Sequence, residues 1–370
     1  MSNLRLAIIG LGSMGATHAN NVVAGKIPGA ELTAVCDSRP DVLAAFAPAK
    51  PFTDYRALLK AGVADAVLIA TPHFQHTAIG IAALEAGLHV LVEKPISVHK
   101  ADCDRLLAAY RGREDRQVFA AMFNQRTLPV HQKLKAMLTA GEIGDVFRAQ
   151  WTITNWFRTD AYYASAGWRA TWAHEGGGVL LNQCPHNLDL FWWFLGDARA
   201  VRAHCHFGRH HRIEVEDEVT AYLELESGAT GVFIASTGEA PGTNRLEIAG
   251  NRGRLILEDD KLSFLRTAVP VREFQRTSPE RFGKPAVEPV AIELALGADQ
   301  HNAIIRNFVS AIRDGAPLIA PAVEGVHSVE LANAMLLSTW LDRTITLPVD
   351  GALYEAELQK RIAASPRTSA

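Results

Sequence analysis

The stretch LAIIGLGSMGATHANN, residues 6–21, decides the fold of this chain. An apolar run typical of a buried strand ends in a glycine-rich turn, and a helical pattern begins there. The turn carries the pattern G-x-G-x-x-G at Gly10, Gly12 and Gly15. In such turns the first glycine permits a tight turn, the second a close approach of pyrophosphate, and the third close packing of helix on sheet. Free N–H groups at the helix start, near Ser13 and Met14, suit phosphates, so the stretch predicts a dinucleotide site.

An acidic residue follows at the distance that such a site requires. Asp37 ends the next apolar run, Glu31–Cys36, about 20 residues after Gly15. A carboxylate there accepts hydrogen bonds from ribose hydroxyls and repels a 2′-phosphate, which favours NAD. Ser38 and Arg39 come next and could serve the phosphate of NADP, so NADP stays open. A purely structural turn with a coincidental aspartate is the alternative interpretation.

The first third of the chain alternates apolar runs with helical patterns, which is typical of a parallel sheet covered on both faces. We therefore expect an α/β, doubly wound Rossmann domain over residues 1–122. The sequence after this domain shows strand-like alternation, turn glycines such as Gly228, and two late helical segments. Residues 123–370 are expected to form an α+β domain for substrate binding and oligomerisation, built on a large, open, mostly antiparallel sheet.

Composition narrows the classes of protein. The chain has 370 residues and a formal net charge of −3, so no basic excess exists to bind nucleic acid. No run approaches the ~20 apolar residues of a membrane span, and the N-terminus lacks a signal-peptide pattern. The cytoplasm is the default expectation. The four cysteines are scattered along the chain. A histidine-rich stretch at residues 204–211, HCHFGRHH, is better explained as a polar edge strand than as a metal site.

Polar residues follow two buried strands at the sheet edge where ligands gather. Thr71, Pro72, His73 and His76 come after the run Asp65–Ala70, and they line the cofactor site or form an ordinary loop. Glu93 and Lys94 end the run Leu88–Val92, and Pro95 restricts the backbone of Lys94 to extended geometry. A fixed ammonium can hold a substrate hydroxyl and stabilise a developing alkoxide. A surface Glu-Lys pair is the alternative.

A second polar cluster lies in EGGGVLLNQCPHNLDLFWWFLG, residues 175–196, where a helix is expected over Gly178–Leu195. Asn182, His186 and Asp189 are spaced to share one face of that helix. Pro185 lacks an N–H, so the helix proper is expected to start near it, with Asn182 in the lead-in turn. Histidine is the usual base for alcohol oxidation, so His186 is the candidate base. The alternative interpretation is that His186 is a structural histidine of the core.

An aromatic and arginine-rich loop precedes this cluster. Aromatic faces with polar tips suit a sugar, and we expect about half of the loop to touch ligand. The candidate substrate contacts are Trp156, Arg158, Tyr163, Trp168 and Arg169. Between the two expected domains, Asn124 is a candidate for the cofactor and Arg126 for the substrate.

The segments GLGSMGATHA (10–19), CDSRP (36–40), ATPHFQH (70–76), VEKPIS (92–97) and EGGGVLLNQCPHNLD (175–189) together resemble the Gfo/Idh/MocA oxidoreductases, the group of glucose–fructose oxidoreductase and inositol dehydrogenase. The resemblance implies that Lys94 is the catalytic lysine and His186 the acid/base. Many members have aspartate where this chain has Asn182, which can only orient the substrate or His186. The resemblance also implies a homodimer or homotetramer.

We therefore expect a NAD-dependent dehydrogenase that oxidises a secondary hydroxyl of a sugar, anhydro-sugar, glycoside or cyclic polyol. Two alternatives stay open. One is a glycoside hydrolase that oxidises its substrate transiently with bound NAD, and the other is a non-catalytic NAD-binding regulator. No metal site is expected.

Overall fold

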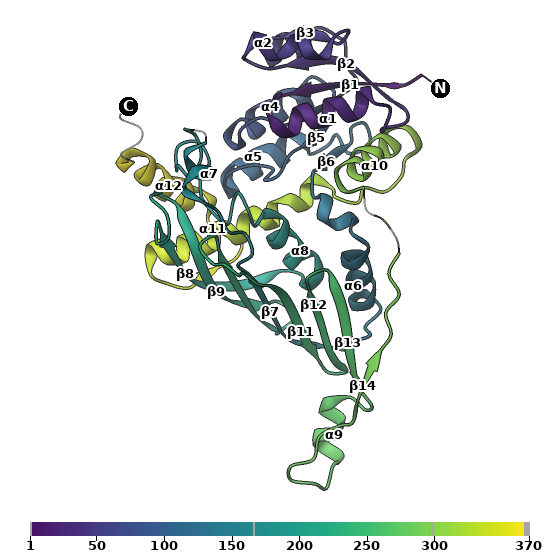
Figure 1. Ribbon diagram of the computed structural model, residues 1–370, viewed down its shortest axis with the longest axis vertical. Coiled ribbons are helices and arrows are strands. Elements are labelled where there is room, and N and C mark those ends of the chain that lie inside the picture. Colours follow the sequence, from purple (N-terminus) through teal and green to yellow (C-terminus); the bar gives the residue numbers. More distant parts are fainter. Residues whose placement is uncertain (1, 166, 296, 298, 366–370) are drawn as a thin grey trace.

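The computed structural model describes residues 2–165, 167–295, 297 and 299–365. Two sheets, A and B, organise the chain, with sheet A at the top of Figure 1 and sheet B below it. The strands of sheet A lie in the order β3-β2-β1-β4-β5-β6, and all neighbouring pairs are parallel. This is the order of doubly wound dinucleotide-binding sheets, so the predicted Rossmann fold is confirmed. The strands are β1 (Leu4–Ile9), β2 (Ala30–Cys36), β3 (Lys50–Phe52), β4 (Ala66–Ile69), β5 (His89–Val92) and β6 (Phe119–Ala121).

Helices cover the strands of sheet A, which explains why β4 is buried along its whole length. The helices that follow these strands are α1 (Ser13–Val23), α2 (Pro40–Leu43), α3 (Tyr55–Lys60), α4 (His73–Glu85) and α5 (Lys100–Tyr110). A late helix, α10 (Gln300–Asp314), also lies beside β6 in Figure 1. Its residues Ile304, Ile305 and Phe308 belong to the same buried cluster as the strands. The boundary at residue 122 stays a prediction, and the core around sheet A includes this later segment.

Sheet B is the expected large, mostly antiparallel sheet. Its order is β14-β13-β12-β11-β7-β10-β9-β8-β15, and β7 with β10 is its parallel pair. The predicted hairpins are confirmed, because β9 turns into β10 at Gly228 and β11 turns into β12 between Gly250 and Gly253. The strands are β7 (Val146–Ile153), β8 (Ala198–Phe207), β9 (Glu216–Leu225), β10 (Thr230–Ser236), β11 (Asn244–Gly250), β12 (Gly253–Glu258), β13 (Lys261–Thr267), β14 (Val287–Val290) and β15 (Ile345–Thr346).

A second buried cluster lies between sheet B and its helices. Trp151, Phe191 and Phe233 are among its largest members. The helices of this half are α6 (Pro129–Thr139), α7 (Asp160–Ala164), α8 (Pro185–Leu195), α9 (Val271–Thr277), α11 (Val326–Leu341) and α12 (Gly351–Ala364). Helix α9 projects from the far end of the sheet in Figure 1.

The expected helix start near Pro185, with Asn182 in the lead-in turn, is confirmed, whereas the wider helical span from Gly178 is wrong. Helix α8 begins at Pro185, and the residues before it form turns. The backbone N–H groups of Gly178 and Leu180 donate to Glu216 Oε1, at 2.8 and 3.0 Å, in place of helical acceptors. The carbonyl oxygen of Glu216 also lies 2.0 Å from where a Cβ of Gly178 would stand, so only glycine fits there.

Within the described residues no helix is long and apolar enough to cross a membrane. The same residues contain no group of three or more His, Cys, Asp and Glu side chains arranged to hold a metal. All four cysteines are buried and free.

Candidate active site

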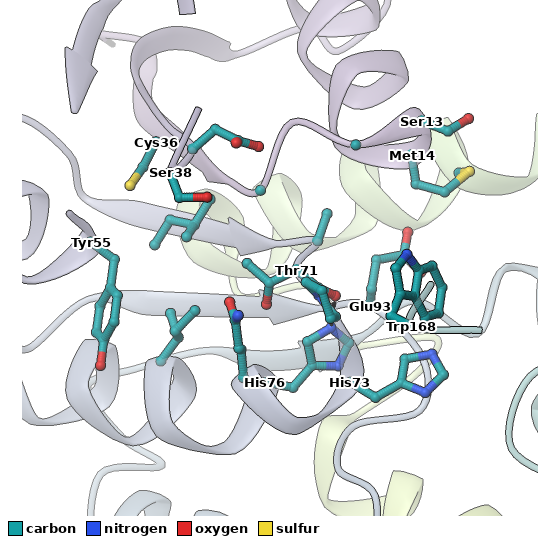
Figure 2. Close-up of a pocket in the computed structure, with 18 of the residues that line it drawn as sticks. Ser13, Met14, Cys36, Ser38, Tyr55, Thr71, His73, His76, Glu93 and Trp168 are labelled. Atoms are coloured by element: carbon teal, nitrogen blue, oxygen red, sulfur yellow. Dashed lines mark hydrogen bonds between the residues drawn. The ribbon is translucent and has the colours of Figure 1, made fainter. Parts of the chain in front are cut away.

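A cavity of about 650 Å³ opens where β1, β2, β4 and β5 end, and Figure 2 shows side chains around it. The turns and helices that follow the strands of sheet A supply most of the lining, and the segments before α8 supply Trp168, Arg169 and Asn182. The cavity brings together most of the predicted cofactor residues: Gly10, Gly12, Ser13, Met14, Asp37, Ser38, Arg39, Thr71, Pro72, His73, His76, Glu93 and Lys94. In the close-up, Ser13 and Met14 lie at the start of α1, and Cys36, Ser38 and Tyr55 lie at the opposite end.

The glycine turn leaves one side of the cavity free of side chains. Gly10 has a φ of +90°, and a Cβ there would lie 2.6 Å from the carbonyl oxygen of Ala70. A Cβ on Gly15 would lie 1.8 Å from the carbonyl oxygen of Gly10, so α1 packs closely on the turn. A Cβ on Gly12 would meet nothing within 4 Å, although the residue lines the cavity. The turn therefore keeps the start of α1 open to a ligand.

Asp37 joins the glycine turn to the end of β2. Its Oδ2 accepts the backbone N–H of Leu11 at 2.8 Å, and its Oδ1 accepts the N–H and Nε of Arg39 at 3.0 and 3.1 Å. Burial raises the pKa of Asp37, but the hydrogen bonds from Arg39 and Leu11 outweigh burial and lower it overall. An ionised carboxylate therefore lines the cavity at the end of β2, where it would suit an unphosphorylated ribose.

Thr71 lines the cavity, and its Oγ1 is buried without a hydrogen-bond partner among the described residues. Such an atom is satisfied when a polar ligand occupies the cavity. With the open glycine turn and the ionised Asp37, it fits a nicotinamide dinucleotide. Thr71, Asp37 and the turn around Gly12 would hold that cofactor.

Two histidines on the first turns of α4 close the lower wall in Figure 2. The ring nitrogens of His76 lie 2.7 Å from the carbonyl oxygen of Thr71 and 2.8 Å from that of Pro95, which ties together the turns after β4 and β5. The His73 ring lies 6.5 Å from that of Trp168. Burial, with nearby His76 and Lys94, lowers the pKa of His73 to about 3, so its ring is neutral at pH 7.

Glu93 and Lys94 stand at the end of β5. Glu93 Oε1 lies 2.8 Å from Nε2 of the fully buried His18 on α1. Lys94 Nζ donates to the backbone oxygen of Asn182 at 3.0 Å. Burial lowers the pKa of Lys94, and the carboxylates of Glu93 and Glu175 oppose that effect. The ammonium is thereby fixed between the two halves of the chain.

His186 is the second residue of α8 and packs edge-on against Phe123, with 6.2 Å between the ring centroids. Its Nδ1 is buried and has no hydrogen-bond partner in the described part of the chain. Burial lowers its pKa well below the usual value, and the positive charge of Lys94 lowers it further. A neutral imidazole therefore lies near Lys94. His186 itself is not among the residues that line the cavity.

Several predicted contacts lie elsewhere. Arg126 does not line the cavity and is only 1% exposed, because its guanidinium binds Asp189 at 2.6 and 2.8 Å and also pairs with Glu324. Asn124 donates to Gln300 at 2.8 Å. The remaining three candidates also lie outside the cavity lining: Trp156, Arg158, which stacks on Trp156, and Tyr163, which donates to Thr237.

Two buried residues near the site were missed from sequence. His18 lies three residues after Gly15, so its place on α1 was visible, but its partner Glu93 is far along the chain. Glu175 directly precedes the glycines 176–178, and an acid beside a glycine run was the available signal.

The comparisons with known proteins agree with this geometry. Residues 4–121 match the profile of an oxidoreductase family with an NAD-binding Rossmann fold, and residues 131–256 match the GFO/IDH/MocA C-terminal domain. The chain is 26% identical to myo-inositol 2-dehydrogenase of Thermotoga maritima, over 87% of this chain and 91% of that protein. It is 24% identical to levoglucosan dehydrogenase of Pseudarthrobacter phenanthrenivorans, over 92% of this chain and 98% of the relative.

One similar solved structure contains NADH. The WlbA dehydrogenase from Bordetella pertussis, in complex with NADH and UDP-GlcNAcA, superposes with a TM-score of 0.79 at 25% identity, covering 94% of this chain and all of that one. The fold and the site thus define an NAD-binding oxidoreductase. The chain belongs to the Gfo/Idh/MocA family.

Proposed function

We propose that the protein oxidises a secondary hydroxyl of a sugar, anhydro-sugar, glycoside or cyclic polyol, with Lys94 and His186 handling the hydroxyl proton. The observation that carries the proposal is the Lys94 ammonium, which rests on Asn182 at the junction between the cavity walls from the two halves. The relatives named for myo-inositol and levoglucosan support a polyhydroxylated substrate.

The roles of the two groups follow from their charge. Bound NAD would supply the hydride acceptor. His186, held neutral by burial and by Lys94, takes the hydroxyl proton. Lys94 donates a hydrogen bond to the same oxygen and stabilises its developing negative charge. Trp168, Arg169 and Asn182 line the same cavity and are proposed substrate contacts, whereas Arg126 is left out because its ion pair occupies it.

A substrate panel tests the proposal. Inositols, aldoses, anhydro-sugars and glycosides are each incubated with NAD and with NADP, and formation of the reduced cofactor is followed by absorbance. We expect net NADH with at least one member of the panel. Cleavage of a glycoside without net NADH would instead indicate the hydrolase, and tight NAD binding without any turnover would indicate the regulator.

A further inference from the structure

A carboxylate lies directly behind Asn182, outside the cavity lining. Glu175 is 2% exposed, and both of its oxygens accept hydrogen bonds. Oε2 accepts the backbone N–H of Ala170 at 2.6 Å, and Oε1 accepts the side-chain amide of Asn182. The side chain thus bridges the aromatic loop and the turn that leads into α8.

The amide of Asn182 can point in one direction only. Its Oδ1 accepts from the Tyr162 hydroxyl at 3.3 Å and from Gln183 Nε2 at 3.0 Å, so its NH₂ group faces Glu175. The backbone oxygen of Asn182 accepts Lys94 Nζ. One residue therefore connects the Glu175 carboxylate to the position of the Lys94 ammonium.

The loop on the other side of Glu175 is held in an unfavourable conformation. Ala170 has a φ of +52°, which a residue with a Cβ adopts at a cost of about 1 kcal/mol or more. This conformation accompanies the hydrogen bond from its N–H to Glu175. Because Ala170 directly follows Trp168 and Arg169, the same carboxylate fixes the segment that lines the cavity.

Charge connects Glu175 to Lys94 as well. Burial raises the pKa of Glu175, and Arg169 and Lys94 are among the groups that oppose this. The titratable groups that interact electrostatically with Lys94 or Glu175 are Glu93, Cys184, Arg169, Glu216, His73, His76, His186 and His301. Most of those near Lys94 are histidines whose pKa burial lowers, and the carboxylates near Lys94 are Glu93 and Glu175, which are its main counter-charges.

We infer that Glu175 is a positioning residue for the proposed reaction: its buried carboxylate balances the charge of Lys94 and, through Asn182, fixes the carbonyl oxygen on which Lys94 rests. The inference rests on the proposed function. According to this inference, the negative charge near Lys94 belongs to Glu175, and Asn182 is the uncharged amide beside it.

An exchange of carboxylate and amide tests this assignment. Glu175→Gln removes the negative charge. It also places the NH₂ group of the glutamine opposite another N–H donor, because both Asn182 and Ala170 donate to residue 175. We expect kcat/KM to fall about tenfold or more. The alkaline limb of the pH profile of kcat/KM, where Lys94 loses its proton, should move to lower pH by about one unit. The reason is that Lys94 loses a nearby opposite charge, which lowers the pKa of its amine.

The double variant Glu175→Gln/Asn182→Asp restores every partner. The introduced glutamine can accept from Ala170 and donate to the introduced aspartate, whose other oxygen still accepts from Tyr162 and Gln183. We expect the rate to recover to within roughly threefold of the unmodified enzyme, with the alkaline limb back in place. Asn182→Asp alone pairs two buried carboxylates and should not match the parent enzyme. Glu214→Gln is the control, because Glu214 also accepts a backbone N–H from this loop, that of Trp172 at 2.7 Å.

A second readout does not need turnover. The pH dependence of amine labelling at Lys94, followed by mass spectrometry on the protein without substrate, reports the pKa of that amine. Labelling of Glu175→Gln should begin about one pH unit lower than in the parent, and the double variant should return it. Unchanged labelling and an unchanged alkaline limb in Glu175→Gln would overturn the inference. If Glu175→Gln does not fold, the double variant decides by folding and rate: a folded double variant with kcat/KM within roughly threefold of the parent supports the exchange of carboxylate and amide, and a folded double variant that stays at least tenfold slower overturns it. A parent enzyme without turnover would overturn the proposed function and leave the labelling result standing.

Discussion

Lys94 Nζ lies 3.0 Å from the backbone oxygen of Asn182, and this hydrogen bond joins the end of β5 to the turn before α8. The two residues are 88 positions apart in the chain. The turn makes the contact possible, because residues 178–184 follow an irregular path anchored on Glu216. The position of the proposed catalytic ammonium therefore depends on both halves of the protein.

Lys94→Ala should abolish most of the activity and leave cofactor binding nearly unchanged. The substitution removes the donor that stabilises the developing alkoxide, which corresponds to a loss of about 100- to 1000-fold in kcat. Steady-state kinetics and titration with NADH, followed by protein fluorescence, check the two parts. Lys60→Ala, at an exposed lysine at the end of α3, is the control. Turnover equal to that of the parent enzyme would remove Lys94 from the mechanism.

Asp37→Asn should shift cofactor preference toward NADP. The amide still accepts the N–H of Leu11, but it no longer repels a 2′-phosphate and no longer pairs with the charge of Arg39. A hydrogen bond to a charged group is worth about 1.5–3 kcal/mol, so the ratio of kcat/KM for NAD over NADP should fall about tenfold or more. Asp41→Asn, at an exposed carboxylate nearby, should leave the ratio unchanged. The same ratio in both variants would contradict this role of Asp37.

Arg126→Met should destabilise the fold and leave KM for the substrate unaffected. The change leaves Asp189 buried without its partner, which costs about 3–5 kcal/mol. Burial already raises the pKa of Asp189 to about 6 in the presence of Arg126. Denaturant unfolding measures the loss, and the double variant Arg126→Met/Asp189→Leu should recover most of it. A large rise in KM in the folded single variant would return Arg126 to the list of substrate contacts.

Glu216→Gln should stabilise the protein at high pH only. Burial raises the pKa of Glu216 from 4.5 to about 7. The folded state therefore holds this proton more tightly than the unfolded state, and stability falls as pH rises from about 4.5 through 7. The full cost, on the order of 3 kcal/mol, is present at pH 8 and absent below pH 4.5. Thermal unfolding at pH 5 and pH 8 should show a gain for the variant only at pH 8, and an equal gain at both would contradict ionisation as the cause.

That the glycine turn and the ends of the parallel strands line one cavity could be predicted from sequence, because the signals are local. Gly10, Gly12 and Gly15 need a particular turn, and that turn fixes the start of α1 whatever the rest of the chain does. Asp37, Thr71 and Lys94 stand directly after buried strands, and the carboxyl ends of parallel strands meet at one edge. Residues that are far apart in the sequence therefore lie around one cavity, because their strands are neighbours in the sheet.

The part of the cavity lining that comes from the loop before α8 could be predicted only in part. Trp168 and Arg169 line the cavity, whereas Trp156, Arg158 and Tyr163 of the same loop lie outside the cavity lining. Composition gave these five residues equal weight, because what separates them is how the loop folds onto distant partners such as Thr237. Arg126 lies outside the cavity lining for a related reason, since Asp189, the acid that pairs with its guanidinium, lies 63 positions further on.

Helix α10 completes the hydrophobic core around sheet A, although it follows nearly all of sheet B in the chain. During synthesis, the strands of the nucleotide-binding half thus leave the ribosome long before α10, the last-made of the helices that pack around them. Until that helix emerges, apolar surface at β5 and β6 stays uncovered, and a fragment truncated after β6 would carry that surface permanently.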